Sequence, residues 1–299
     1  MSPDTNLLII GAGPAGTAAT MMAVSLGMRV HLIERHRVGG KLHHVGALSN
    51  APGNWSTGPE LAAALTADLE RLAPTNLLRR TTGVVTEVNA DDEQAHVGLA
   101  DGTRHGAAAV IVATGVTTLS PADTDWITGP AGLWPAPLWR TPPADMRGVT
   151  WVLGADRPLG TWLRAHPDVT RTISVLCPQE DDYKATEVAT DPRVHLVPCS
   201  AVTITSDPAH GWTLDVTERS GDQRQFLAST LLGNLGNRPA ALPGLAQAAD
   251  GYCPTDKQHP RVWTVGDLRS ARFQRIITAQ GSGAEAALAH YYDTALIGA

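Results

Sequence analysis

The first 34 residues alternate between apolar and glycine-rich segments in the order strand, turn, helix and strand. An apolar run at 6–10 is typical of a buried parallel strand, and the turn at 11–16 carries three glycines. The alanine-rich stretch at 17–26 then predicts a helix, and the run at 28–34 predicts a second strand that ends on Glu34. This is a β-α-β unit with an acidic residue about 20 positions after the glycines, the pattern of a dinucleotide-binding domain.

A second, weaker β-α-β pattern follows a stretch rich in proline and tryptophan at 120–143. That stretch breaks the periodicity and places a domain boundary near residue 117. The second unit is predicted from apolar strands at 149–153 and 172–176 around a short helix at 159–165. The remaining expected elements are helices at 58–72 and 278–296 and strands at 84–89, 95–99, 107–113, 194–197, 200–205, 212–217, 230–235 and 262–267.

These elements predict an α/β fold of two nested Rossmann-like dinucleotide-binding domains. The first domain would comprise residues 1–117 and 238–299, and the second, inserted domain residues 118–237. Because the second glycine motif is poorly kept, we expect the inserted domain to be a degenerate domain of the NAD(P)-binding type.

Composition and charge exclude several kinds of function. The chain has 299 residues, 43% of them hydrophobic, with a net charge of −6 and no visible basic patch. Nucleic acids and anionic membranes are bound through such patches, so neither is an expected partner. Residues 5–28 carry no charge, but four glycines and a proline within the strand-turn-helix pattern argue against a membrane span or a signal peptide.

The three cysteines, Cys177, Cys199 and Cys253, are far apart in the sequence and form no C-x-x-C. This spacing supports neither a disulfide framework nor a zinc site, and we expect no metal. We interpret the three residues as buried structural thiols in a protein of the reducing cytoplasm.

The glycines of the first turn have distinct roles in a dinucleotide site. Gly11 permits the tight turn, Gly13 lets a pyrophosphate approach the backbone, and Gly16 lets helix and strand pack closely. The helix N-terminus adds amide hydrogens and a positive dipole, and Glu34 is placed to accept hydrogen bonds from an adenosine ribose. A merely glycine-rich turn is the alternative, but the strand before it and the helix after it favour a bound dinucleotide.

Several further motifs occur in a fixed order along the chain. They are Gly39-Gly-Lys-Leu42, Ser49-Asn-Ala-Pro-Gly53, Thr57-Gly-Pro-Glu60, Ala113-Thr-Gly115, Gly236-Asn-Arg-Pro239, Val265-Gly-Asp267, and Gln274-Arg-Ile-Ile-Thr278 with Gly281. In these motifs the sequence resembles the thioredoxin-reductase-like flavoproteins, the low-molecular-weight branch of the two-dinucleotide-binding-domain family. The resemblance spans nearly the whole chain and implies the nested fold and a homodimer.

The resemblance also implies bound FAD and assigns its contacts. Gly11, Gly13, Gly16 and Glu34 would hold the pyrophosphate and ribose. Asp267 would bind the ribityl or phosphate part. The other positions that match are Leu42, Asn50 beside the isoalloxazine, Val85 at the adenine through its backbone, Thr114, Gly115 and Gly266 lining the site, and Arg275 and Ile276 near flavin N1 and C2=O.

The sequence departs from the family at three places. Residues 132–140, where the family has its catalytic C-x-x-C, contain no cysteine, so dithiol exchange is excluded unless distant cysteines meet. Residues 154–160 keep only the first glycine of the second fingerprint, and Asp156 would put negative charge where a pyrophosphate sits. Acidic residues at 180–182 replace the family's basic clamp for the 2′-phosphate of NADPH, so neither NADPH nor NADH is an expected ligand.

His43 and His44 stand where the family has hydroxyl residues beside the flavin. An imidazole there would act as general base in substrate oxidation, since its unperturbed pKa is about 6.5. The alternative is that one of them is exposed to solvent or hydrogen-bonds the cofactor. Trp126, Trp134 and Trp139 would either wall an apolar pocket over the flavin or pack in a core, and core packing is the better-supported hypothesis.

The sequence therefore predicts an FAD-dependent oxidoreductase, an oxidase or dehydrogenase of a small organic substrate without dithiol chemistry. Hydride would pass from the substrate to flavin N5, and oxygen or a protein electron acceptor would reoxidise the flavin. Two alternatives stay open. One is an NAD(P)H-dependent reductase of ferredoxin or another acceptor, and the other is a non-catalytic FAD-binding subunit.

Overall fold

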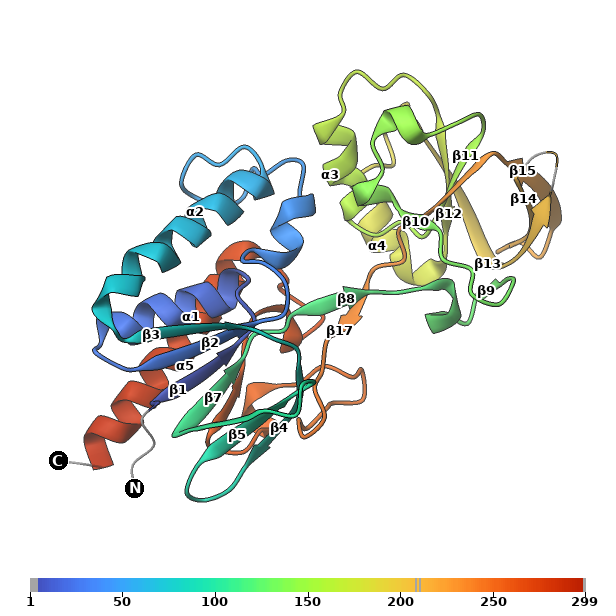
Figure 1. Cartoon of the computed structure of the whole chain (residues 1–299). Helices are drawn as coiled ribbons and strands as arrows, with labels where there is room; N and C mark the ends of the chain where they lie inside the picture. The colour runs from blue at the N-terminus through green and yellow to red at the C-terminus, as the bar shows by residue number, and fades with distance from the viewer. Residues whose placement is uncertain (1–4, 208, 210, 298–299) are drawn as a thin grey trace. The chain divides into compact units, whose positions relative to one another are not determined.

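The computed structural model describes residues 5–207, 209 and 211–297, and it divides into two compact units (Figure 1). The first unit consists of the chain up to His43, Leu48–Thr117 and the chain from Arg238 onward. The second unit consists of His44–Ala47 and Thr118–Asn237. The second unit is thus inserted into the sequence of the first.

The first unit is built on a five-stranded sheet in the order β18-β7-β1-β2-β3. Its strands are β18 (Val262–Thr264), β7 (Ala109–Val112), β1 (Leu7–Ile10), β2 (Val30–Glu34) and β3 (Leu78–Thr82). All neighbours in this sheet are parallel. All four residues of β1 are buried, as expected for a central strand covered on both faces.

Alternate residues of β1 belong to different cores. Leu7 and Ile9 pack with apolar residues of α1 (Pro14–Ser25) and α2 (Gly58–Leu72). Leu8 and Ile10 pack on the other face with a three-stranded antiparallel sheet of β4 (Val85–Ala90), β5 (Ala95–Leu99) and β6 (Arg104–Ala107). The sheet is therefore sandwiched between helices on one face and a small sheet on the other (Figure 1).

The helices of the first unit start and pack through specific residues. Helix α2 begins with a capping box, in which Thr57 caps the Glu60 amide and the Glu60 carboxylate accepts from the Thr57 amide. The C-terminal helix α5 (Ile276–Ile297) packs against α1. A side chain at Gly283 would place its Cβ 2.0 Å from the Ala15 carbonyl oxygen, so only glycine allows this close approach.

The second unit contains an eight-stranded sheet with a parallel part and an antiparallel part. In the order of the sheet its strands are β10 (Ala136–Pro137), β16 (Thr230–Gly233), β11 (Thr150–Leu153), β12 (Ile173–Cys177), β13 (Val194–Asp207), β14 (Gly211–Glu218) and β15 (Gln223–Ala228), with β9 (Ile127–Thr128) paired to β13. Helices α3 (Pro158–Ala165) and α4 (Asp182–Ala185) follow β11 and β12.

The expectation of two strands at 194–197 and 200–205 is wrong, because both lie in the single strand β13. Its first residues pair in parallel with β12, and the rest pair antiparallel with β14. Pro198 and Ser200 suggest a break in the sequence. The chain instead continues through a register shift between Cys199 and Ala201.

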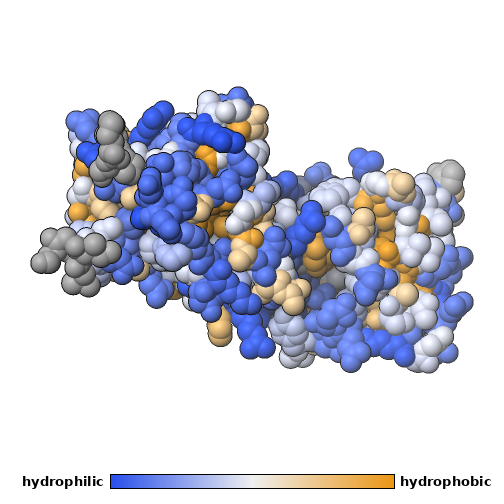
Figure 2. Space-filling model, turned by 90° about the horizontal axis from the view of Figure 1, so that it is seen from below, coloured by the Kyte–Doolittle hydropathy of each residue, from blue (hydrophilic) through white to orange (hydrophobic). Residues whose placement is uncertain are grey.

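A short ladder of β8 (Val116–Thr118) and β17 (Asn237–Pro239) forms where the chain leaves the first unit and returns to it. No helix within the described ranges is both long and apolar enough to cross a bilayer. Hydrophilic residues cover much of the face shown in Figure 2, with apolar residues visible between them.

Candidate functional site

The turn between β1 and α1 forms the first candidate site. Gly11 has φ +97°, and an added Cβ would lie 2.6 Å from the Ala113 carbonyl oxygen. At Gly16 an added Cβ would lie 1.8 Å from the Gly11 carbonyl oxygen. Side chains at these two positions would therefore push helix, turn and strand apart, so both glycines are required by the fold itself.

Gly13 differs from its neighbours because it faces open space. Apart from Gly13 itself and its neighbours along the chain, no described residue has an atom within 4 Å of an added Cβ there, and the φ of −75° is accessible to any residue. Gly13 is also the N-cap of α1, and no described side chain caps that end or adds an acidic group to its first turn. An uncapped helix N-terminus beside an open backbone fits a pyrophosphate.

Glu34 at the end of β2 completes this crevice. Its Oε2 accepts a hydrogen bond from the Ala12 amide at 2.6 Å, and its Oε1 accepts one from the His36 amide at 2.9 Å. The carboxylate is thereby fixed beside the glycine turn, where a ribose of a bound dinucleotide would lie. The residues present fit the adenylate half of FAD.

Charged groups of two other segments, Lys41 and Arg275, act on Asp267. Burial raises the pKa of the Asp267 carboxyl above its usual value, while Lys41 and Arg275 act in the opposite direction and favour the carboxylate. The Gly266 amide before it donates to the Ser282 hydroxyl at 2.9 Å. Lys41 lies within the Gly39-Gly-Lys-Leu42 motif, but the sequence did not indicate that it would act on Asp267.

The other expected cofactor residues are distributed over the same unit. Leu42 and Val85 are buried, in the helix-side core and the core of the small sheet respectively. The Thr114 hydroxyl donates to the Ala240 carbonyl at 2.8 Å, and Gly115 has φ +66°. The side chains of Asn50 and Arg275 are exposed, and Arg275 directly precedes Ile276, the first residue of α5.

His43 and His44 lie in different environments. The His43 Nε2 lies 2.8 Å from the Val38 carbonyl oxygen, so this nitrogen carries the proton and the ring is tied to its own unit. His44 belongs to the second unit, where its ring stands edge-on to the Trp139 ring with centroids 4.9 Å apart.

The turn between β11 and α3 in the second unit begins like the first turn. Gly154 has φ +86°, and an added Cβ would lie 2.6 Å from the Asn234 carbonyl oxygen. The Ala155 amide donates to Asp181 Oδ2 at 2.9 Å. The buried Asn234 side chain donates to the carbonyls of Gly154 and Asp156 at 3.3 and 2.8 Å and fastens the turn to the end of β16.

Asp156, Asp181 and Lys184 form an ion cluster against this turn. Lys184 Nζ lies 3.0 Å from Asp156 Oδ1 and 2.8 Å from Asp181 Oδ1, and all three side chains are less than one-fifth exposed. Burial disfavours the ammonium, but the two carboxylates outweigh it and raise the pKa of Lys184 above its usual value. Lys184 is therefore charged at neutral pH.

A polar cavity of about 540 Å³ adjoins the cluster within the second unit. Among its lining residues are Asp123, Asp125, Glu180 and Asp181 against the single cation Lys184. The whole second unit has 14 Asp and Glu against nine Lys and Arg, a net charge of −5 out of the chain's −6. An anionic ligand entering this cavity meets unfavourable charge.

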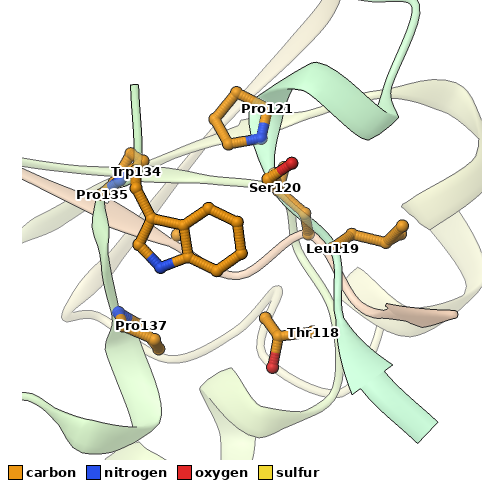
Figure 3. Close-up of a pocket in the computed structure, with 9 residues that line it drawn as sticks. Thr118, Leu119, Ser120, Pro121, Trp134, Pro135 and Pro137 are labelled. Atoms are coloured by element: carbon orange, nitrogen blue, oxygen red, sulfur yellow. The ribbon is translucent and has the colours of Figure 1, made fainter. Parts of the chain in front are cut away.

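Two of the tryptophans singled out in the sequence differ in burial, and all three cysteines are buried. Trp126 is buried in a core of the second unit, whereas Trp134 is 61% exposed. Trp134 and three prolines border a cavity of only about 10 Å³, room for about one water (Figure 3). All three cysteines are free and buried, and burial raises the pKa of Cys177 to about 11 and that of Cys199 to about 12.

Comparison with known proteins identifies the architecture. Residues 5–127 match the family of pyridine nucleotide-disulphide oxidoreductases. The solved thioredoxin reductase of Lactococcus lactis superimposes with a TM-score of 0.76 at 21% identity, over 97% of this chain and 98% of the other. That of T. acidophilum gives a TM-score of 0.74 at 19% identity, with the same coverage. The chain has the thioredoxin reductase fold.

Two curated relatives share the sequence to different extents. A thioredoxin reductase of Listeria monocytogenes is 23% identical over 93% of this chain and 90% of its own length. A ferredoxin–NADP reductase of Nocardioides sp. is 35% identical, but over 127 residues, 40% of this chain and 38% of its own. The matched family and the thioredoxin reductases are FAD-binding flavoproteins, so the expected thioredoxin-reductase-like flavoprotein fold is confirmed.

Proposed function

We propose that this protein is an FAD-dependent oxidoreductase whose flavin exchanges electrons with a small organic substrate, without a pyridine nucleotide and without a dithiol. One contrast carries the proposal: the Gly13 turn is open to a pyrophosphate, whereas the corresponding turn of the second unit carries Asp156 in the ion pair with Lys184. Residues 132–140 contain no cysteine, and the three cysteines elsewhere are buried, which supports chemistry without thiols.

The first unit would hold the cofactor through groups with distinct tasks. The α1 N-terminus and the Gly13 backbone would bind the pyrophosphate, and the Glu34 carboxylate the adenosine ribose. Asp267, Lys41 and Arg275 would lie at the flavin half of FAD. There Arg275 would favour negative charge near N1 of the flavin ring. When bound, FAD supplies the acceptor for a hydride from the substrate.

A general base is the remaining requirement if the substrate loses an O–H or N–H proton as the hydride leaves. We assign this task to the pair His43 and His44 because the family resemblance places them beside the flavin. The Val38 carbonyl uses His43 Nε2, so a base at His43 would act through Nδ1. Oxygen or a protein would then accept the electrons.

Anaerobic titration of the FAD-loaded protein tests this function. NADH and NADPH should leave the flavin absorbance near 450 nm unchanged over minutes, whereas a panel of small alcohols, amines and hydroxy acids should contain a compound that bleaches it. Rapid bleaching by either nucleotide would refute the proposal. A protein that cannot be loaded with FAD would refute it at an earlier step.

The match to a ferredoxin–NADP reductase supports a second candidate, electron exchange with a protein partner. The match covers 127 residues, 40% of this chain. Reduced ferredoxin added anaerobically would then bleach the flavin, while the panel of small substrates would not.

A further inference from the structure

The segments that follow three neighbouring parallel strands converge on one point in the second unit. The turn after β11 contributes Asp156, the segment after β12 contributes Asp181 and Lys184, and the segment after β16 contributes Asn234. An added Cβ on Gly236, also after β16, would lie 3.6 Å from the Asp156 carboxyl carbon and 3.8 Å from Lys184 Nζ. This is the crevice at the carboxyl ends of the strands, where open α/β sheets bind their ligands.

The charged groups at this point are already paired within the chain, whereas the buried Asn234 Oδ1 accepts no hydrogen bond from the described residues. Asp181 bonds the Ala155 amide through one oxygen and Lys184 through the other. Lys184 bonds Asp156 as well, and Asn234 bonds two carbonyls of the turn. The Ala155 amide is held by Asp181 just as the Ala12 amide is held by Glu34 in the first turn. The ammonium of Lys184 is the group that could bind a phosphate here, and it is held by the protein's own carboxylates.

The charges of the cluster show that Asp156 is the carboxylate in excess of the Asp181–Lys184 pair. Two carboxylates and one ammonium leave a net charge of −1 in a largely buried site. Asp181 is needed by the turn because it satisfies the Ala155 amide. Removing Asp156 would leave the neutral pair of Asp181 and Lys184 and release one side of the ammonium toward the cavity of about 540 Å³ that Lys184 lines.

We propose that Asp156 closes the second dinucleotide crevice and that Lys184, which it holds, is a latent ligand for a dinucleotide's phosphate. The inference rests on the proposed function, in which the native chain uses no pyridine nucleotide, and adds the residue that enforces this. It assigns the block at the turn itself to one side chain, in addition to the acidic residues that line the cavity.

The test is NADH binding to the full-length FAD-loaded protein, measured by equilibrium dialysis at fixed ionic strength. Asp156→Gly should lower the Kd for NADH at least about tenfold relative to the wild type. Asp222→Gly is the matched control, since it removes the same charge from an exposed turn of the same unit and should leave the Kd unchanged. Adding Lys184→Met to Asp156→Gly should abolish the gain.

Two results would overturn the inference. One is an Asp156→Gly protein, folded by its thermal transition, that binds NADH no better than the wild type, and the other is a gain that persists after Lys184→Met. If Asp156→Gly fails to fold, Asp156→Asn removes the charge with the same shape and gives the same comparison. Dialysis reports binding alone, so these outcomes are independent of whether NADH reduces the native flavin, the measurement on which the proposed function depends.

Discussion

The two dinucleotide-type turns of this chain agree in their first two positions and differ at the third. Gly11 and Gly154 both have positive φ, and an added Cβ at either would meet a carbonyl oxygen of a neighbouring strand segment at 2.6 Å. The next amide donates to a carboxylate in both turns, from Ala12 to Glu34 and from Ala155 to Asp181. The third position is Gly13 in one turn and Asp156 in the other.

The fold and the ligand site thus place separate demands on this turn. The first glycine and the amide–carboxylate bond hold the strand, turn and helix together, and both units keep them. The second turn has four residues between strand and helix instead of three, and α3 has eight residues where α1 has 12. The second unit keeps its β-α-β structure although the third residue of its turn, Asp156, is charged.

Gly13→Val should have the largest effect on this comparison. A branched side chain would fill the space above the turn, so we expect the protein to purify without bound FAD, as judged by the loss of absorbance near 450 nm. The fold should survive, because no described atom lies within 4 Å of the new Cβ. Gly233→Ala, whose Cβ would lie at an ordinary 3.5 Å from Pro135 O, should retain FAD. Retention of FAD by the valine variant would contradict the proposed site.

Replacing His43 and His44 together by glutamine tests the base. If the pair accepts the substrate proton, the anaerobic rate of flavin reduction should fall about 100-fold or more, while FAD binding persists. Comparing the two single variants would show which ring acts, since His43 Nε2 is bonded to Val38 and His44 lies against Trp139. An unchanged rate between about pH 5 and 8 would remove both residues from the mechanism.

Lys184→Met addresses the stability of the second unit. The substitution leaves the carboxylates of Asp156 and Asp181 together in a largely buried site without their cation. Loss of one partner from a buried ion cluster costs about 3–5 kcal/mol of unfolding free energy, measurable by urea unfolding with hydrogen exchange to locate the change. Lys257→Met, at an exposed position of the first unit, should change stability little. Equal stability of both variants would show that the cluster contributes no net stabilisation.

The thiols should give the smallest effect. Since burial raises the pKa of Cys177 to about 11 and of Cys199 to about 12, the reactive thiolate is scarce at pH 8. A thiol reagent should leave the native protein unlabelled at that pH, label all three cysteines after unfolding, and react faster as the pH rises. The triple alanine variant should keep its rate of flavin reduction. Fast labelling of one native cysteine would point to a redox role.

Local pattern was sufficient to predict the strand, turn and helix of the first candidate site. The strand, turn and helix around Gly11, Gly13 and Gly16 are contiguous in sequence, and Glu34 follows at the end of the next strand. The predicted helix at 58–72 and strand at 95–99 have the bounds of α2 and β5. In these segments hydrophobic period, capping residues and glycine positions all favour the same structure.

Pairings between distant residues could not be predicted in the same way. The sequence places Asp156 in the turn, but its partner Lys184 lies in the short helix after the next strand. No local pattern indicates that the Lys184 side chain reaches the turn, just as none indicates that the charge of Lys41 lowers the pKa of Asp267. Such contacts follow from how the strands are placed, which the sequence alone does not give.

The chain leaves the first unit and re-enters it at neighbouring points. In the second unit the Leu119 amide donates to the Gly236 carbonyl at 3.1 Å, and in the first the Ala240 amide donates to the Gly115 carbonyl at 2.9 Å. A domain can be inserted into another when the two ends of the insert lie close together, because the host chain then keeps its own fold on both sides of the insertion point. The inserted segment, its glycine motif included, can therefore change without altering the strand, turn and helix around Gly11 or the position of Glu34.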